Sequence, residues 1–412
     1  MDQSSQIAAV APELVGRSTS AATAAKEIGL TRAGALRLDA IDMLRGLVIV
    51  LMVLDHVRDF LHAPAFLFSA TDLTQTNPLL FMTRWVTHLC APTFVFLSGV
   101  SIFMQRANGK APGELSKFLL TRGLWLILLE LTVIGFGFNM GPPLAFMQVI
   151  WAIGASMVLM AAVVRLPAMG VLALGAFIII FHPIIAGAIR PDAPGALWFL
   201  TMQPGPPVFM RGFVPYPLIP WFGIMCLGYG LGFIFRQPGE QRRRSVLALA
   251  MSFLAAFVVL RAINGYGDPA PWSVQSSGIM TLLSFINVSK YPPSLMYVLA
   301  TLGVSMLLFL ALEKLTGPLQ RLFLAFGRTS MFTYILHIYL VHCLAIVIGA
   351  LGGIPVSYYI DFLLKFQNGG GQGFGLAVVY AVWLSTILML YPLSSRFARV
   401  KRERRDWWLS YI

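Results

Sequence analysis

The sequence predicts an all-α, polytopic membrane protein with about ten transmembrane helices and both termini in the cytoplasm. Of its 412 residues, 58% are hydrophobic and only 11% are charged, whereas ordinary soluble domains carry about 25% charged residues. Apolar stretches recur along the chain, each close to the roughly 20 residues that an α-helix needs to cross a bilayer. In chain order, the predicted spans are residues 43–62, 85–105, 118–138, 143–164, 168–189, 217–236, 245–263, 294–312, 323–350 and 374–393.

The segments outside these spans complete the predicted organisation. Residues 1–36 are rich in Ala, Ser and Thr, and we expect them to form a disordered cytoplasmic tail. A membrane domain then covers residues 37–395, and residues 396–412 form a basic and aromatic cytoplasmic tail. The ninth apolar stretch is longer than a bilayer requires, so we expect it to be tilted, kinked or extended past the membrane surface.

The charged residues and the cysteines narrow the classes of function. With a cytoplasmic N-terminus, the inside segments hold 23 of the 30 Lys and Arg residues, as the positive-inside rule requires. The net charge of +13 is spread over short loops, so we expect topology signals and no binding of nucleic acid. Cys90, Cys226 and Cys343 lie in or beside apolar stretches without metal-ligand spacing, so we expect neither disulfides nor a metal site.

The first span carries ionisable residues where a lipid-facing helix avoids them. The run "DHVRD" at 55–59 directly follows an apolar stretch, although an ionisable side chain near the bilayer centre costs roughly 2.5–3.5 kcal/mol. At about 100° per residue, four ionisable residues share one face of the helix, and such a face must look into the bundle interior. Arg58 is expected to point away, toward the outer interface. The four residues on the inward face are Asp42, Arg45, His56 and Asp59.

The rise of the helix separates this polar face into two levels. His56 lies about 17 Å beyond Arg45, which places Arg45 near the cytoplasmic surface and His56 in the outer half of the membrane. Asp42 and Arg45 are three residues apart and can form an ion pair. The polar face is interpreted either as the wall of a functional cavity or as a helix-packing device whose charges satisfy one another.

Other parts of the chain bring polar residues to the level of His56. Glu130 lies about 18 Å from the inner side of the third span, either in the cavity or hydrogen-bonded to a neighbouring helix. His337 lies on one face of the ninth span with other polar residues. Arg84 and His88 lie near the outer mouth of the second span, and Lys290 lies in an outward segment. These last three are candidate substrate-binding residues.

The residues alone leave two chemistries open. A histidine among carboxylates is typical of general base catalysis near neutral pH. The same set, Asp55, His56 and Asp59, is typical of a proton relay in a transporter or flippase.

Several stretches resemble a known family. "IDMLRGLVIVLMVLDHV" at 41–57 resembles the first-span signature of the transmembrane acyltransferase superfamily, LDGLRGxAxxxVxxxH, with His56 at its histidine. "FVFLSGVS" at 94–101 is similar to its FFxLSGF stretch, and "FGRTSMFTYILHIYLV" at 326–341 to its LGxxSYxxYLxH segment. Within the superfamily, the chain is most similar to the bacterial relatives of heparan-α-glucosaminide N-acetyltransferase. The stretches that carry this closer likeness are "RWVTHLCAPTFVFLSGVS", "YPLIPWFGIMCLGYGLG" and "KYPPSLMYVLATLG", at 84–101, 216–232 and 290–303.

The resemblance implies an enzyme of a bacterial inner membrane that transfers an acyl group, usually acetyl, from cytoplasmic acetyl-CoA. The acceptor would be a hydroxyl or amine of a carbohydrate or lipid-linked molecule outside, and membrane lipids would surround the protein. The lysosomal enzyme's catalytic histidine is proposed to lie in a KHASWNG-like loop. This sequence has no such stretch between 62 and 85, so the resemblance does not extend to glucosaminide as the acceptor.

The implied roles fall on residues of several predicted spans. His56 would act as base toward the acceptor or as a transient acyl carrier. Asp59 or Glu130 would orient it, and His337 would donate a hydrogen bond to the developing oxyanion. The nucleotide of acetyl-CoA would lie at the cytoplasmic mouth, and its pantetheine arm would reach toward His56. The arginines expected to bind the nucleotide phosphates are Arg45, Arg122, Arg321 and Arg328.

Overall fold

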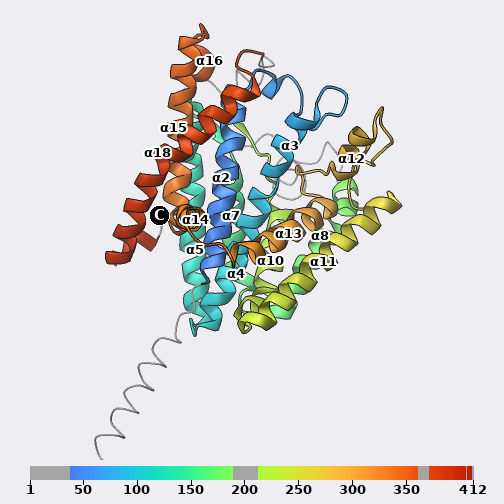
Figure 1. The fold of residues 1–412 in the computed structure, drawn as a ribbon. Helices are drawn as coiled ribbons and strands as arrows, with labels where there is room; N and C mark the ends of the chain where they lie inside the picture. Colours follow the sequence, from blue (N-terminus) through green and yellow to red (C-terminus); the bar gives the residue numbers. More distant parts are fainter. Residues whose placement is uncertain (1–37, 189–211, 361–370, 405, 411–412) are drawn as a thin grey trace, which may run out of the picture. The chain divides into compact units, whose positions relative to one another are not determined.

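The structure of the protein is a computed structural model. The chain divides into two units, Met1–Leu38 and Asp39–Ile412. The tail expected at 1–36 lies outside the described residues, and the second unit forms the helical bundle (Figure 1). The described residues are 38–188, 212–360, 371–404 and 406–410.

The second unit consists almost wholly of α-helices, which confirms the predicted fold class. Within the described ranges, eight helical segments are long and apolar enough to cross a membrane. Two further predicted spans are also helical: α2 has 23 residues but carries many charges, and α7 has 15 residues. The α-helices are α2 (Asp39–Leu61), α3 (Pro78–Thr87), α4 (Cys90–Ala107), α5 (Pro112–Leu129), α6 (Gly135–Asn139), α7 (Val149–Val163), α8 (Ala168–Ala188), α10 (Leu218–Gly230), α11 (Gly239–Ile263), α12 (Gly278–Ile286), α13 (Leu295–Leu312), α14 (Pro318–Arg328), α15 (Ser330–Leu351), α16 (Ser357–Ile360) and α18 (Leu376–Glu403).

The predicted ninth span is broken into α14 and α15. Thr329 between them has φ −121° and ψ 33°, outside the helical range, and its hydroxyl donates to the carbonyl of Ala325 at 2.8 Å. The expected kink is therefore a break between two helices. At the other end of the bundle, α18 continues as helix to Glu403, past the predicted end of the last span at residue 393.

Two short elements lie in the segments expected on the outer side. The helix α12 occupies part of 264–293. The strand β2 (Gly212–Phe213) pairs in parallel with β1 (Ala145–Phe146). The buried Arg261 guanidinium donates to four backbone carbonyls between residues 270 and 287, which holds this outer segment against α11.

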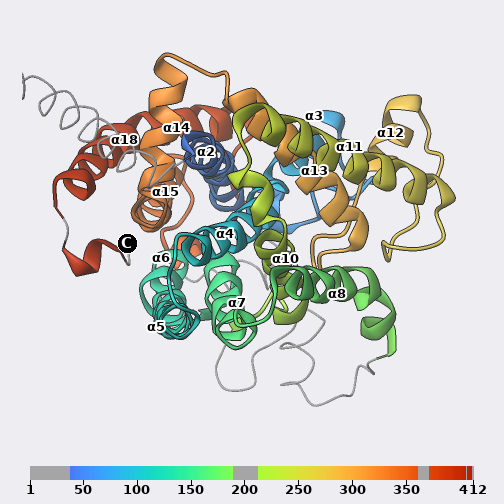
Figure 2. The same cartoon turned by 90° about the horizontal axis from the view of Figure 1, so that it is seen from below.

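The helix α2 lies at the centre of the bundle. It contacts α3, α4, α13, α14, α15 and α18, and both views show it between the α15–α18 side and the α4–α13 side (Figures 1 and 2). Two glycines allow α14 to cross it closely. A Cβ at Gly46 would lie 1.9 Å from the carbonyl oxygen of Phe323, and one at Gly327 would lie 1.7 Å from that of Asp42. Small residues at such crossings let helix backbones approach within a membrane, and here they bring α14 and the following α15 against the polar face of α2.

Candidate active site

A cavity of about 520 Å³ lies at the end of α2 that is remote from its N-terminus. The last turns of α2, residues 65–70, the α3–α4 region, residues 144–149, β2 and residues 290–291 contribute to its described lining. His56 and Asp59 both line it, together with Asp55 and Arg58. Of the four residues on the predicted polar face, His56 and Asp59 therefore line a cavity, whereas Asp42 and Arg45 are not among its described lining residues.

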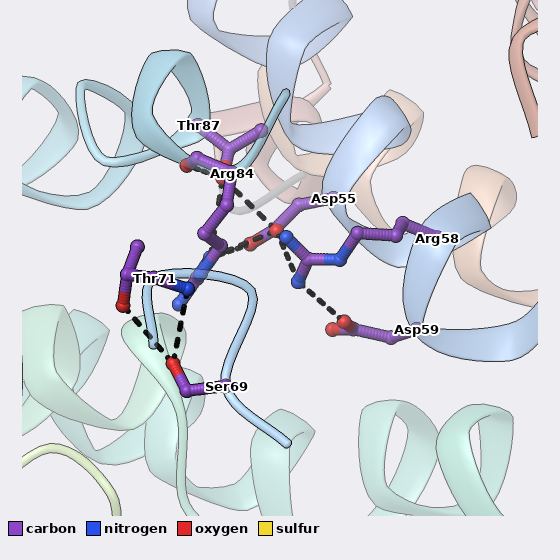
Figure 3. Close-up of polar contacts among 7 residues, drawn as sticks. All are labelled: Asp55, Arg58, Asp59, Ser69, Thr71, Arg84 and Thr87. Atoms are coloured by element: carbon purple, nitrogen blue, oxygen red, sulfur yellow. Dashed lines mark hydrogen bonds and ion pairs between the residues drawn. The ribbon is translucent and has the colours of Figure 1, made fainter. Parts of the chain in front are cut away.

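An ion-pair cluster forms one side of this cavity (Figure 3). Nη1 of Arg84 donates to both carboxylate oxygens of Asp55 at 2.8 Å. Nη2 of Arg58 lies 2.9 Å from Oδ1 of Asp55 and 2.6 Å from Oδ1 of Asp59. The Thr87 hydroxyl donates to Oδ1 of Asp55 at 2.9 Å. Asp55 is thus held between two guanidinium groups, and the helices α2 and α3 are joined through it.

The expectation that Arg58 points toward the outer interface is wrong. Its side chain is buried and bridges Asp55 and Asp59. A snorkelling arginine needs water at its tip, but here two carboxylates on its own helix provide the partners. The spacing of three residues between Asp55 and Arg58 was the available signal, because residues three apart on a helix are neighbours.

His56 is held by a second histidine from α15. Nδ1 of His56 lies 2.7 Å from Nε2 of His337, and Nδ1 of His337 lies 3.2 Å from the carbonyl oxygen of Thr333. A carbonyl oxygen only accepts, so Nδ1 of His337 carries its proton, and its Nε2 accepts from Nδ1–H of His56. In neutral His56 this arrangement leaves Nε2 unprotonated, and Nε2 is the ring nitrogen that can take a proton from a substrate.

The structure places His337 behind His56 and not at the cavity. His337 is fully buried and is not one of the described residues that line the cavity. The packing of α15 against α2 produces this contact between residues far apart in sequence. His337 is therefore suited to fix the orientation and tautomer of His56.

Glu130 caps a neighbouring helix. Its carboxylate accepts from the backbone N–H of Gln148 at 2.9 Å and from that of Trp151 at 3.2 Å. Gln148 is the N-cap residue of α7 and Trp151 lies in its first turn, where helix donors have no partner within the helix. A negative charge is also favourable at a helix N-terminus. The structure thus matches the alternative in which Glu130 is hydrogen-bonded to a neighbouring helix. The Glu130 carboxylate also holds the backbone of Gln148, a residue that lines the cavity.

Replacing Glu130 with glutamine is expected to lower the free energy of unfolding by about 1.5–3 kcal/mol, because one charge-assisted hydrogen bond to α7 is lost. The midpoint of thermal unfolding in detergent measures this change. Glu240→Gln is a suitable control, since Glu240 is exposed and pairs with Arg244 within its own helix. An unchanged midpoint together with a hundredfold loss of turnover would instead assign Glu130 to the chemistry.

The remaining predicted substrate-binding residues occupy different environments. Lys290 lines the cavity, and its ammonium lies 4.9 Å from the ring centroid of Tyr291 and 5.7 Å from that of Tyr216. His88 is buried outside the described lining, where its ring contacts that of Tyr297 edge-on and its carbonyl accepts from the Tyr297 hydroxyl at 2.8 Å.

Two of the predicted cofactor-binding arginines meet at the opposite end of α2. Arg45 lies 3.1 Å from Asp42, which confirms the expected ion pair, and also donates to the Ser101 hydroxyl on α4. Arg328 lies 2.8 Å from Asp39 and 3.9 Å from Asp42. Arg45 and Arg328 therefore share Asp42, whereas Arg122 lies on α5, whose main packing partner is α7.

The cavity belongs to the His56 end of α2 only. None of its described lining residues comes from the Arg45 end, and Met52 is the residue of α2 nearest to that end. Between the two levels, Val48, Ile49 and Val53 are buried. Within the described part of the chain, no group of three or more His, Cys, Asp or Glu side chains is arranged to hold a metal ion.

The loop that follows α2 is ordered by its own side chains. Asp72 accepts from the hydroxyl of Thr74 at 2.8 Å, from its backbone N–H at 3.0 Å and from the Gln75 amide at 3.0 Å. These hydrogen bonds, that of the Thr74 hydroxyl above all, hold the pKa of Asp72 below its ordinary value. Asn287 reaches across from the outer segment and donates to the carbonyl of Thr71 at 3.0 Å, so both outer segments are joined beside the cavity.

Tyr216, Tyr291 and Gln148 also line the cavity, and the sequence did not predict them. Tyr216 and Tyr291 precede predicted spans, Gln148 lies within the predicted span 143–164, and none of the three carries a charge. The only signal was indirect, because Tyr216 and Tyr291 lie within stretches that resemble the acyltransferase family.

Comparison with known proteins adds one positive finding. A family model described as "Heparan-alpha-glucosaminide N-acetyltransferase, catalytic" matches residues 37–262. The matched region runs from α2 to α11 and includes His56, Arg84 and Glu130, whereas Lys290 and His337 lie beyond it. No curated protein matches the chain.

Proposed function

Because this match covers more than half of its length, the chain belongs to the heparan-α-glucosaminide N-acetyltransferase family, and from that membership we propose a specific reaction. The protein is a membrane transferase of the acetyltransferase kind. In the proposed reaction, it moves an acetyl group from cytoplasmic acetyl-CoA to a hydroxyl or amine of a glycan-type acceptor on the other side of the membrane. The observation that carries this proposal is the His337–His56 pair at the edge of a polar cavity.

His56 acts as the general base in the proposed mechanism. The acceptor oxygen or nitrogen attacks the thioester carbonyl carbon, and its proton passes to Nε2 of His56. The tetrahedral intermediate then collapses, the carbon–sulfur bond breaks, and the departing thiolate takes the proton from His56. A thioester is already activated, so positioning and proton transfer provide most of the catalysis required.

Gln148 is better placed than His337 to stabilise the oxyanion. Gln148 lines the cavity, and its buried amide nitrogen has no hydrogen-bond partner among the described residues. A buried donor without an acceptor is costly, and a transition-state oxyanion would satisfy it. The Glu130 cap holds the backbone of Gln148 in place for this role.

The donor approaches from the Arg45 end of α2 in this proposal. Arg45 and Arg328 would hold the nucleotide phosphates. Arg328 would then have to exchange its ion pair with Asp39, whose side chain is 49% exposed, for one with a phosphate. The pantetheine arm then spans the roughly 17 Å to His56. Because Val48, Ile49 and Val53 are buried, transfer requires a movement that opens a passage beside α2.

A proton-coupled transporter is supported less well by the same geometry. A proton carrier binds and releases its proton in each cycle. Asp55, the first residue of the suggested relay, is committed to ion pairs with both Arg58 and Arg84, which such a cycle would have to break and remake.

The proposal is tested with the full-length protein purified in detergent and acetyl-CoA labelled in the acetyl group. We expect release of the coenzyme A thiol above a detergent blank, and transfer of label to acceptors in a panel of sugars and amino sugars. Absence of thiol release in detergent and in vesicles, with movement of solute that follows a proton gradient, would contradict the enzyme and support the transporter.

A further inference from the structure

A second cavity, of about 530 Å³, is lined by α11 and the end of α13, and the proposed transfer reaction does not use it. The two helices lie side by side in both views, on the side of the bundle remote from α18 (Figures 1 and 2). Three cations and three apolar side chains contribute to the described lining of this α11–α13 cavity. These six residues are Arg243, Arg244, Leu247, Leu310, Ala311 and Lys314.

The α11–α13 cavity lies at the Arg45 end of the bundle, away from His56. Arg236, three residues before α11 begins, donates from Nη1 to the carbonyl of Ala107 at 3.0 Å. Ala107 is the last residue of α4, and Ser101 on the same helix accepts from Arg45. The start of α11 and the end of α13 are thus at the level of Arg45, which the positive-inside rule predicts to be cytoplasmic.

Two carboxylates beside this cavity are already paired with arginines of α11. Arg242 donates to Oε1 of Glu313 from Nε at 3.0 Å and from Nη2 at 2.8 Å. Nε of Arg244 lies 3.1 Å from Oε1 of Glu240, which also lines the cavity. Each carboxylate therefore neutralises one neighbouring arginine.

Arg243 and Lys314 provide an excess of positive charge at the cavity. In the described part of the chain, Arg243 makes a single ion pair, with Glu313, and its distance of 3.7 Å is longer than a hydrogen bond. Among the same residues, no carboxylate lies within ion-pair distance of the Lys314 ammonium. One of these cations comes from each wall of the cavity, so an anion bound between them would contact both.

Apolar side chains continue both walls toward the membrane interior. Leu247 lies one turn beyond Arg243 on α11, and Leu310 lies one turn before Lys314, so each cation shares a helix face with a leucine. Leu247 and Met251, a further turn along α11, are 47% and 53% exposed. Most of the apolar window of α11 is not buried inside the protein. The cavity therefore joins a cationic end to a surface that faces lipid.

We propose that the α11–α13 cavity binds an anionic phospholipid of the leaflet predicted to be cytoplasmic. The headgroup phosphate accepts from Arg243 and Lys314, and an acyl chain lies over Leu247 and Leu310. A soluble anion would have no part that covers the two leucines, whereas basic pockets between membrane helices are typical sites for anionic lipid headgroups. A topology signal only requires cations at this end of the helices, and not cations that line one cavity together with apolar residues. The inference is independent of the proposed transfer reaction.

Binding of two phospholipids with identical acyl chains tests the inference. Phosphatidylglycerol and phosphatidylcholine both contain a phosphate, but only phosphatidylglycerol has a net negative charge. Each is mixed into the detergent micelles of the purified full-length protein, and the mole fraction that gives half of the maximal thermal stabilisation is measured. We expect this mole fraction to be roughly tenfold lower for phosphatidylglycerol, because the cations at the cavity exceed the carboxylates.

Matched variants locate the bound lipid. Arg243→Gln combined with Lys314→Gln is expected to remove most of the preference for phosphatidylglycerol. Lys117→Gln combined with Arg165→Gln is the control and is expected to keep it, because both residues are exposed cations predicted on the same side of the membrane but outside this cavity. Ala311→Trp places a large side chain in the cavity without changing a charge, and it is expected to weaken the binding of both phospholipids. This variant provides the test if the charge variant does not fold.

Three outcomes would overturn the inference. The first is equal affinity of the wild-type protein for the two phospholipids. The second is a preference that survives in the folded cavity variants, or that the control variant loses to the same extent. The third is stabilisation by glycerol phosphate or coenzyme A that disappears when Arg243 and Lys314 are replaced, because the cavity would then bind a soluble phosphate in place of a lipid.

Discussion

Replacement of His56 with alanine is expected to slow acetyl transfer by roughly 10²–10⁴-fold, the contribution of a well-placed general base, while the protein stays folded. The base is lost, and His337 does not replace it, because His337 is fully buried behind it. The rate of thiol release from acetyl-CoA in the presence of an acceptor measures the effect. The thermal unfolding midpoint shows that the bundle is intact.

A matched histidine variant separates chemistry from packing. His182 on α8 is buried but is not part of the described cavity lining, so His182→Gln is expected to keep the wild-type rate. Normal transfer by a folded His56→Ala protein would remove His56 from the mechanism. The same pair of variants distinguishes a base from an acyl carrier: label that stays on the wild-type protein but not on His56→Ala after unfolding identifies His56 as the carrier.

Replacement of His337 with leucine is expected to reduce the rate by about 10²-fold or more, although His337 does not face the cavity. Leucine leaves Nδ1–H of His56 without an acceptor, so the ring can rotate or adopt the other tautomer, in which Nε2 carries the proton. In the serine protease triad, a wrong histidine tautomer lowers kcat by about 10⁴-fold. The measurement is kcat with saturating acetyl-CoA.

The conservative variant shows whether His337 acts through orientation. His337→Gln offers a carbonyl oxygen that can accept from Nδ1–H of His56, so its rate is expected to lie within about tenfold of wild type. A role in packing alone would give both variants rates that follow their thermal stabilities. Equal rates for leucine and glutamine variants of equal stability would contradict the positioning role.

The sequence predicted the inward polar face of α2 because helical periodicity and the cost of charge in lipid are local properties. His56 and Asp59 do line a cavity, and Asp42 does pair with Arg45. The same reasoning was wrong for Arg58. A periodicity of 100° per residue predicts only where Arg58 leaves the helix. Its long side chain turns back toward Asp55 and Asp59 on the same helix, and these two carboxylates determine the position of the guanidinium.

The sequence did not predict the contacts between segments that are far apart along the chain. Glu130 and Gln148 are brought together by a return of the chain between α6 and α7, and the residues alone did not decide between a cap and a cavity group. The ninth apolar stretch was predicted as one long span, but the helix is interrupted at Thr329. Gly327, just before this interruption, lets α14 approach α2 closely. Without that crossing, α15 would present His337 elsewhere.

The sequence by itself determined the class of protein, the order of its apolar spans, the family and the inward direction of His56, since hydropathy, periodicity and motif spacing are local properties of the chain. Only the tertiary structure decided that His337 contacts His56 and lies outside the described cavity lining, that Glu130 caps α7, and that Lys290 lines the same cavity as His56. These relations depend on how the helices rotate and cross, which is set by the packing of many side chains at once.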